Sequence, residues 1–358
     1  MKKKLVGMIA TATLLTMALA GNVQAAEIRS VGPDGEAAVD ASTIELTDDQ
    51  IAQIKEGGYT AAICLHYGGN DWSTSQQKGL EDTFGELGIE IVAVTDANFS
   101  AETQVSNIET VMAKKPDILV SIPTDATATA DAYKQAAAAG IKIVFMDQRA
   151  DGLEAGKDYV SVVSADNYGN GYASGTVLGD ALGGKGKVAM VYYDANFAPT
   201  NQRDEGFRDA MKNYPDIEIV TEQGFTDESG CAEQGDAILT QFPNIDGIYA
   251  SWDVPMEGVL SAVRAAGMEG KVTLACNDLG NNVAREIASG NIAGGGAQMP
   301  YDQGVAEAKL AALALLGEET PSYVAVPAET VTHENVLEAY TDVYHVETPD
   351  WLKEAYVE

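Results

Sequence analysis

Short apolar runs alternate with amphipathic stretches along the first half of the chain. The apolar runs predict strands at residues 59–65, 89–94, 118–122, 141–146 and 159–163. Between them, apolar residues recur three and four positions apart, which predicts helices at residues 76–87, 101–113 and 127–139. Gly88, Gly140 and Pro116 stand where these helices should end. Strands that alternate with helices of this length predict β–α–β units and a parallel sheet.

The same alternation begins again near Lys187. Here the pattern predicts strands at 188–193, 217–223, 247–250, 272–276 and 292–297, and helices at 203–213, 231–241, 256–266 and 283–288. A helix at 301–316 follows the last strand and should pack back on the first domain. No low-complexity linker separates the two rounds. We therefore predict two doubly wound α/β domains, each with its own parallel sheet, joined by a strand hinge.

The ends of the chain complete this division. Residues 1–25 resemble a cleavable signal peptide, because Lys2 to Lys4 precede an apolar stretch and small residues surround Ala25. A membrane anchor is the alternative, but it needs about 20 unbroken apolar residues. We expect a lead at 26–58 that contains one short helix, an N-terminal lobe from 59–164 plus 299–322, a C-terminal lobe from 165–298 plus 323–330, and a tail at 331–358. Residues 323–326, before the tail, have a strand-like pattern. No cysteine offers lipid attachment, so we expect a periplasmic or secreted protein.

Composition narrows the possible ligands. The 358 residues carry 22 Lys and Arg against 54 Asp and Glu, a formal net charge of -32, which repels nucleic acid and anionic lipid. Cys64, Cys231 and Cys276 are expected as core thiols, although any two could pair. The three histidines are scattered and no Cys-x2-Cys pair occurs, so we expect neither a metal site nor a cofactor.

Polar and aromatic side chains gather at the predicted strand ends. In an open parallel sheet these ends face the ligand crevice. Carboxylates and amides can bond hydroxyl groups, an arginine fork can bridge oxygens, and flat rings can cover C–H faces, so the mixture favours a carbohydrate. The alternative is that the Asp and Asn residues only cap helices and form turns. The candidate residues are His66, Asn70, Trp72, Asp147, Gln148, Arg149, Arg203, Trp252, Asp253, Asn277, Asp278 and Gln298.

Several motifs then resemble one family. They include Asn70-x-Trp72, Asp147-Gln148-Arg149, the run from Arg203 to Phe207, Asn277-Asp278 and the run from Gln298 to Gly304. Their order over residues 59–326 resembles the ribose type of periplasmic solute-binding proteins, type I, which share their fold with the ligand-binding halves of LacI-like repressors. The resemblance implies two similar domains joined by three hinge strands, a sugar bound in the cleft, and delivery to an ATP-driven (ABC) importer.

The resemblance also implies roles for single residues. Asp147 matches a hydroxyl-binding carboxylate of the first domain, Arg203 a clamp from the second, and Asp278 a second carboxylate, while Gln298 lies at a hinge crossing. The chain departs from ribose binders at four places, with Gln148 where Arg is usual, Trp252 where Asn is usual, Asn277 where an aromatic is usual, and His66 where a small hydroxyl residue is common. Ribose, another pentose, a hexose and a polyol all remain open.

Other functions find less support in the sequence. Gly-x-Ser-x-Gly is absent, residues 169–175 miss the dinucleotide spacing, and residues 183–187 are expected as a tight turn because a phosphate loop needs Ser or Thr after its Lys. A secreted carbohydrate-active enzyme is therefore the weaker alternative. A repressor would need a helix-turn-helix where the signal peptide stands. A ligand-sensing module that presents its closed form to a membrane receptor remains open, and we expect a monomer that is not an enzyme.

Overall fold

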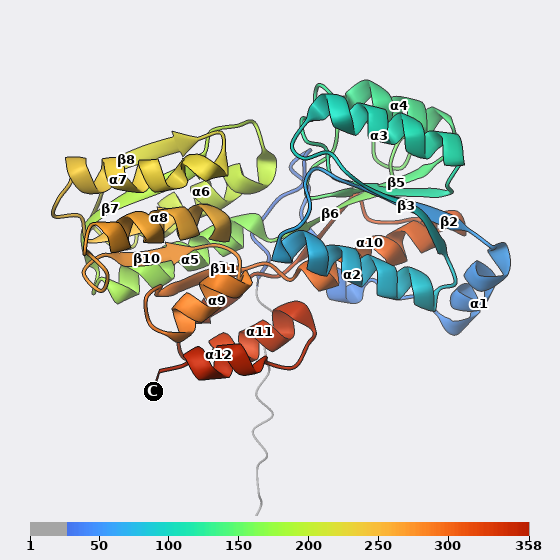
Figure 1. Ribbon diagram of the computed structural model, residues 1–358. Helices are drawn as coiled ribbons and strands as arrows, with labels where there is room; N and C mark the ends of the chain where they lie inside the picture. Colours follow the sequence, from blue (N-terminus) through green and yellow to red (C-terminus); the bar gives the residue numbers. More distant parts are fainter. Residues whose placement is uncertain (1–26, 358) are drawn as a thin grey trace, which may run out of the picture.

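The computed structural model describes residues 27–357 as two α/β lobes side by side (Figure 1). The expected signal peptide falls outside these residues. The first lobe contains a seven-stranded sheet in the order β1-β12-β6-β5-β4-β2-β3, and all its pairs are parallel. Its strands are β1 (Val39–Asp40), β2 (Thr60–Leu65), β3 (Glu90–Asp96), β4 (Ile118–Ser121), β5 (Lys142–Met146), β6 (Ser161–Ala165) and β12 (Tyr323–Val326).

The second lobe contains a six-stranded sheet in the order β13-β11-β10-β9-β7-β8. Only β13 runs antiparallel to its neighbour. Its strands are β7 (Lys185–Tyr193), β8 (Asp216–Phe225), β9 (Gly247–Ala250), β10 (Thr273–Cys276), β11 (Gly294–Ala297) and β13 (Glu329–Thr332). The order β6-β5-β4-β2-β3 in the first sheet corresponds to the order β11-β10-β9-β7-β8 in the second, so β5 and β10 occupy matching positions. The two sheets therefore repeat one topology.

Helices cover both faces of each sheet, as a doubly wound fold requires (Figure 1). In the first lobe α1 (Asp48–Gly57), α2 (Asp71–Glu86) and α10 (Pro300–Leu315) cover one face, and α3 (Ala101–Lys114) and α4 (Ala130–Ala138) cover the other. In the second lobe α5 (Asn167–Ala181) and α6 (Ala198–Met211) lie opposite α7 (Cys231–Gln241), α8 (Asp253–Ala265), α9 (Asn281–Ala288), α11 (Val336–Tyr344) and α12 (Asp350–Ala355).

The chain passes between the lobes three times, from β6 to α5, from β11 to α10 and from β12 to β13. Helix α10 packs on α2 of the first lobe, as predicted. The lobe boundaries need correction at the C-terminal side. Residues 323–326, expected in the second lobe, form β12 and pair with β6 in the first sheet. The tail is no separate unit, because Val336, Val343 and Leu352 are buried in the core of the second lobe.

Glycines let the helices that lead to the cleft pack closely in both lobes. A Cβ on Gly171 of α5 would lie 1.8 Å from the carbonyl oxygen of Arg203 in α6. A Cβ on Gly79 of α2 would lie 2.2 Å from the carbonyl oxygen of Tyr301 in α10. Any larger residue would push these backbones apart. The two contacts fix α6 and α2, which carry Arg203 and Trp72 to the cleft.

Three further observations concern the described residues. Cys64, Cys231 and Cys276 are all buried and unpaired, so each is a core thiol. No helix among residues 27–357 is long and apolar enough to cross a membrane. Within that same part of the chain, no three His, Cys, Asp or Glu side chains are grouped so that they could hold a metal ion.

Candidate functional site

A cavity lies between the two lobes at the carboxyl ends of their strands. It encloses about 480 Å³ of empty space, counting its open mouth. Both lobes contribute to its walls, which are formed by His66, Tyr67, Asn70, Trp72, Phe99, Ile122, Asp147, Tyr193, Phe197, Pro199, Thr200, Arg203, Trp252, Asp278 and Gln298.

Two carboxylates occupy matching places in the two lobes. Asp147 follows β5 and Asp278 follows β10, and both adopt left-handed backbone conformations, with φ of 53° and 70°. This conformation costs about 1–2 kcal/mol for a residue with a side chain. It is held because each amide bonds to the neighbouring strand, Asp147 N to Val163 O at 2.7 Å and Asp278 N to Gly296 O at 2.8 Å. Strain of this kind is concentrated at ligand sites, and here it directs both carboxylates into the cavity.

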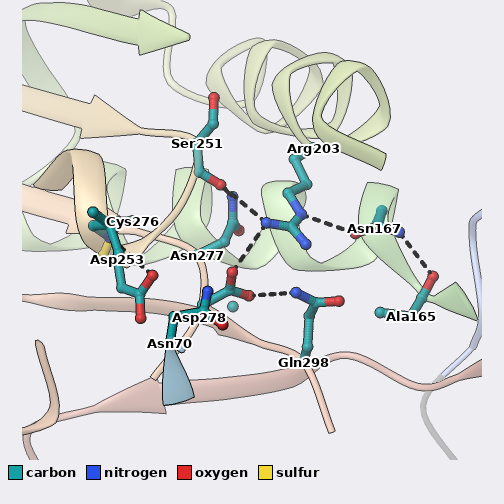
Figure 2. A network of polar contacts seen from close by, with 12 residues as sticks. Asn70, Ala165, Asn167, Arg203, Ser251, Asp253, Cys276, Asn277, Asp278 and Gln298 are labelled. Carbon is teal, nitrogen blue, oxygen red and sulfur yellow. Dashed lines mark hydrogen bonds and ion pairs between the residues drawn. The ribbon is translucent and has the colours of Figure 1, made fainter. Parts of the chain in front are cut away.

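Arg203 forms the centre of the polar contacts in the second lobe (Figure 2). Its Nε donates to Asn167 Oδ1 at 2.8 Å, and its Nη1 donates to Asp278 Oδ2 at 3.1 Å and to Ser251 O at 3.3 Å. Its Nη2 has no hydrogen-bond partner among residues 27–357 (Figure 2). Burial alone would lower the pKa of Arg203, but Asp278 and Asp147 raise it, so the guanidinium stays charged. The guanidinium is thus held in place by three hydrogen bonds, and its Nη2, unpaired in the described part of the chain, remains free to donate to a ligand oxygen.

The remaining carboxylate oxygens are partly occupied. Asp278 Oδ1 accepts from Gln298 Nε2 at 2.8 Å, and Gln298 Oε1 is buried without a partner in the described chain. Asp147 Oδ1 accepts from Ser164 Oγ at 2.9 Å and Gln303 Nε2 at 3.3 Å. Burial raises the pKa of Asp147 in spite of the charge on Arg203. Since Asp147 Oδ2 receives none of these bonds, it is available to a hydroxyl donor.

Aromatic rings form most of the other walls. The His66 ring lies 5.7 Å from Phe197, nearly parallel to it, and 5.8 Å from Trp72, edge to face. Trp252 packs edge to face on Tyr193 at 5.6 Å. Burial lowers the pKa of His66 to about 3, so the ring is neutral at physiological pH. His66 Nδ1 and the Nε1 atoms of Trp72 and Trp252 are buried without partners in residues 27–357, a combination that favours a ligand with both C–H faces and oxygens.

The structure does not bring four of the predicted site residues to this cavity. Asn277 is fully buried and donates to Tyr249 Oη at 2.8 Å, so it supports the strand end from behind. Asp253 begins α8 and accepts from its neighbour's amide, and burial raises its pKa well above the usual range. It lies beside Gln298 in a smaller adjoining pocket. Asn277 and Asp253 therefore lie near Arg203 and Asp278 but do not line the cavity.

Gln148 and Arg149 line a different pocket, together with Val31 and Pro33 of the N-terminal lead. Gln148 Nε2 donates to Pro123 O at 2.8 Å, and its Oε1 accepts from Ala198 N at 3.2 Å, which links the lobes. Arg149 pairs with Asp34 at 2.7 Å in the N-terminal lead and also donates to a nearby carbonyl. The left-handed backbone conformation of Asp147 explains why Gln148 and Arg149 do not line the cavity, because it turns the chain away from the cavity after Asp147.

Asn70 lines the cavity but also serves as a helix cap. Its Oδ1 accepts from Ser73 N at 2.9 Å and its Nδ2 donates to Tyr67 Oη at 2.7 Å. The sequence analysis missed Tyr67, Phe99, Ile122, Tyr193, Phe197, Pro199 and Thr200, which also line the cavity. Most of them follow strand ends, so the rule that selected the polar candidates could also have selected these residues.

Comparison with known proteins agrees with this geometry. A family model described as a periplasmic binding protein domain matches residues 61–319, more than half of the chain. The chain belongs to the family of periplasmic binding proteins. The D-ribose/D-allose-binding protein of Pseudomonas aeruginosa is 29% identical over 273 residues, which cover 73% of this chain and 83% of the relative.

Two solved structures extend the likeness to the fold. The solute-binding protein of an ABC transporter from Actinobacillus succinogenes, with bound D-allose, has a TM-score of 0.72 at 29% identity and covers 78% of this chain and 99% of its own. A second solute-binding protein, from Agrobacterium vitis with bound α-D-tagatopyranose, has a TM-score of 0.74 at 26% identity. The match covers 80% of this chain and 98% of that protein. The expected type I fold with two α/β lobes is confirmed, and the sheets are mostly parallel.

Proposed function

We propose that this protein captures a neutral sugar or polyol in the cavity between its lobes and delivers it to an ABC importer. One observation carries the proposal. Arg203, braced by Asn167 and Asp278 in the second lobe, shares a single cavity with Asp147 from the first lobe. A polyhydroxylated ring can accept from Arg203 Nη2 while it donates to carboxylate oxygens on both sides.

The charge of the cavity supports a neutral ligand. Asp147 and Asp278 face one guanidinium, and His66 adds no charge because its pKa is about 3. An anionic ligand would therefore meet a site with no spare positive charge. Hydroxyl groups can donate to carboxylates without bringing charge, and the rings of Trp72 and Trp252 can cover C–H faces. These features together favour a carbohydrate or a cyclic polyol.

Closure of the lobes supplies the mechanism. Ligand groups that bond to both lobes stabilise the closed form by their differential affinity for it. An importer can then distinguish loaded from empty protein by shape. We place the protein outside the cytoplasm, in the periplasm or as a secreted protein, and as a monomer without a nucleic-acid partner, consistent with its formal charge of -32. A role as a ligand sensor for a membrane receptor would use the same closure.

No observation favours catalysis at this site. A general base works best with a pKa near the operating pH, whereas His66 has a pKa of about 3 and is enclosed by aromatic rings. Related proteins named in the comparisons bind sugars such as D-ribose and D-allose. We therefore assign binding and transport, and no reaction, to this chain.

A thermal-shift screen tests the proposal. The panel contains D-ribose, D-allose, D-tagatose, D-arabinose, D-xylose and myo-inositol, with L-leucine and phosphate as ligands of other classes. A sugar at 100 times its dissociation constant should stabilise the protein by about 2.7 kcal/mol. We expect at least one sugar or polyol to raise the melting temperature, and L-leucine and phosphate to leave it unchanged. A shift with only leucine or phosphate would overturn the assignment.

A further inference from the structure

The two lobes also meet outside the cavity, at the first residues of two helices. Asp71 begins α2 in the first lobe, and Asn281 begins α9 in the second lobe. Asn281 donates to Asp71 through both its backbone N and its Nδ2, each at 2.8 Å. One carboxylate thus receives two bonds from a residue 210 positions away. Because the partners belong to different lobes, a hinge motion that moves α2 away from α9 breaks both bonds.

Helix α9 has no cap of its own. The residue before it is Gly280, which has no side chain to accept from the amides of the first turn. Asp71 therefore does for α9 what a capping carboxylate normally does for its own helix, since it accepts from the helix's first amide and lies at the positive end of the dipole. Helix α2 is independent of this contact, because Asn70 caps it.

The absence of a side chain at position 280 permits the approach. A Cβ on Gly280 would lie 2.1 Å from Asp253 Oδ2 and 3.3 Å from Asp71 Oδ2. The glycine therefore brings a carboxylate from each lobe close to one backbone segment. This is a second observation, separate from the hydrogen bonds, that the segment is shaped for contact between the lobes.

The C-terminal tail holds this segment from the other side. Tyr340 Oη donates to Asn281 Oδ1 at 2.5 Å, and Tyr344 Oη donates to Leu279 O at 2.8 Å. Tyr340 thereby orients the Asn281 amide so that its Nδ2 faces Asp71. Helix α11 lies beyond residue 319, where the match to the family model ends. The contact is thus built in part from a segment that the family match does not cover.

The same tail reaches the first lobe at a second point. His345 Nε2 lies 3.0 Å from Asp302 Oδ1, and its ring lies 4.4 Å from that of Tyr301. Both partners belong to the start of α10, which packs in the first lobe. The tail is seated in the core of the second lobe through Val336 and Val343. The tail is therefore anchored in the second lobe and contacts the first lobe at this point.

We propose that Asp71, Asn281 and Tyr340 form a closure clasp, a set of positioning residues that stabilises the closed form without touching the ligand. The clasp acts on the hinge equilibrium, so it populates the closed form measurably even in the ligand-free protein. It also tightens the apparent affinity for any ligand that binds the closed form, by the same factor by which it raises the closed population. This second consequence rests on the proposed function, whereas the first does not.

Small-angle X-ray scattering of the ligand-free protein tests the clasp. We expect the wild-type curve to require a closed fraction. Asp71→Ala should reduce the ratio of closed to open molecules about ten-fold, the lower end of the range for losing a hydrogen bond to a charged group because Asn281 is exposed, and should increase the radius of gyration. Tyr340→Phe should change the ratio in the same direction by less. Asp48→Ala is the matched control, because Asp48 also begins a first-lobe helix but makes no contact between the lobes.

Asn281→Ala removes the Nδ2 bond from the other lobe and keeps the backbone bond, so it should open the protein by less, and it keeps the test valid if Asp71→Ala folds poorly. The double variant should then be no more open than Asp71→Ala alone, which a merely structural role for the two residues would not produce. Equal radii for wild type, Asp71→Ala and Asn281→Ala would overturn the clasp, as would a ligand-free wild type that is entirely open. The experiment contains no sugar, so it tests the clasp even if the proposed function is wrong.

Discussion

Replacing Arg203 by lysine separates the geometry of the guanidinium from its charge. The arginine is about 95% buried and makes three hydrogen bonds, to Asn167, Asp278 and Ser251. A lysine nitrogen can pair with Asp278, but it cannot also reach Asn167 and offer a free donor to a ligand. At least one bond to a charged group is lost, worth about 1.5–3 kcal/mol. We expect the free energy of unfolding to fall by about that amount.

Ligand affinity should fall as well, because the free Nη2 disappears. Loss of a charge-assisted bond of about 1.5–3 kcal/mol corresponds to a dissociation constant about 10–150 times larger. Urea denaturation measures the first effect, and isothermal titration with the sugar that gives the largest thermal shift measures the second. Both effects can be compared with a control on the same helix.

Arg208→Lys is that control. Arg208 also lies on α6 and binds Glu222 through two nitrogens, at 3.2 and 2.6 Å, but both side chains are 37% exposed. A surface pair of this kind contributes about 0–1 kcal/mol. The account of the clamp would be refuted if Arg203→Lys unfolded and bound sugar like Arg208→Lys.

Three further predictions concern the same lobes. Asp147→Asn and Asp278→Asn should each weaken sugar binding by about 1–3 kcal/mol in calorimetric titrations, and wild-type affinity in both would mean that the carboxylates only hold the strand ends. Burial raises the pKa of Asp204 from 3.8 to about 7, so its contribution to stability is complete below about pH 4 and is lost as the pH rises through 7. Urea unfolding at pH 5 and pH 8 should show wild type losing about 2–3 kcal/mol relative to Asp204→Asn, and parallel profiles would contradict this. Gly171→Ala should cost more than 2 kcal/mol, since its Cβ would meet the Arg203 carbonyl at 1.8 Å, whereas Gly85→Ala, which meets nothing within 4 Å, should be neutral or stabilising in the same assay.

The sequence predicted most helices and strands because their apolar residues follow one clear period. The helix predicted at 231–241 has those same bounds in the structure as α7. Helix α5 was missed for a physical reason. It is rich in glycine and buried on several sides, with Gly171, Gly175 and Gly179 packed against neighbours, so its sequence carries no amphipathic period.

The sequence could predict those cavity residues that directly follow a predicted strand. Asp147 and Asp278 could be selected because they follow apolar strands, but the left-handed turns that direct them inward leave no pattern in the sequence. Arg149 was selected by the same rule and lies elsewhere, since its partner Asp34 is 115 positions away in the lead. Contacts over such separations depend on how the segments pack, which local periodicity does not encode.

The most direct test of the central claim is whether ligand binding changes the two tryptophans that line the cavity. Trp72 belongs to the first lobe and Trp252 to the second, both are 8% exposed, and the third tryptophan, Trp351, lies in α12 away from the cavity. Closure over a sugar should change both environments together. Intrinsic fluorescence is therefore titrated with the sugar that gives the largest thermal shift, in wild type and in a Trp72→Phe, Trp252→Phe double variant.

We expect a saturable change in the wild type that is mostly lost in the double variant, although Trp351 still fluoresces. Phenylalanine keeps a ring at both positions, so calorimetry should show that the double variant still binds, weaker by about 0.5–1.5 kcal/mol for each altered ring contact. A full fluorescence change in a double variant that binds normally would place the ligand outside the cavity between the lobes, and would contradict the account.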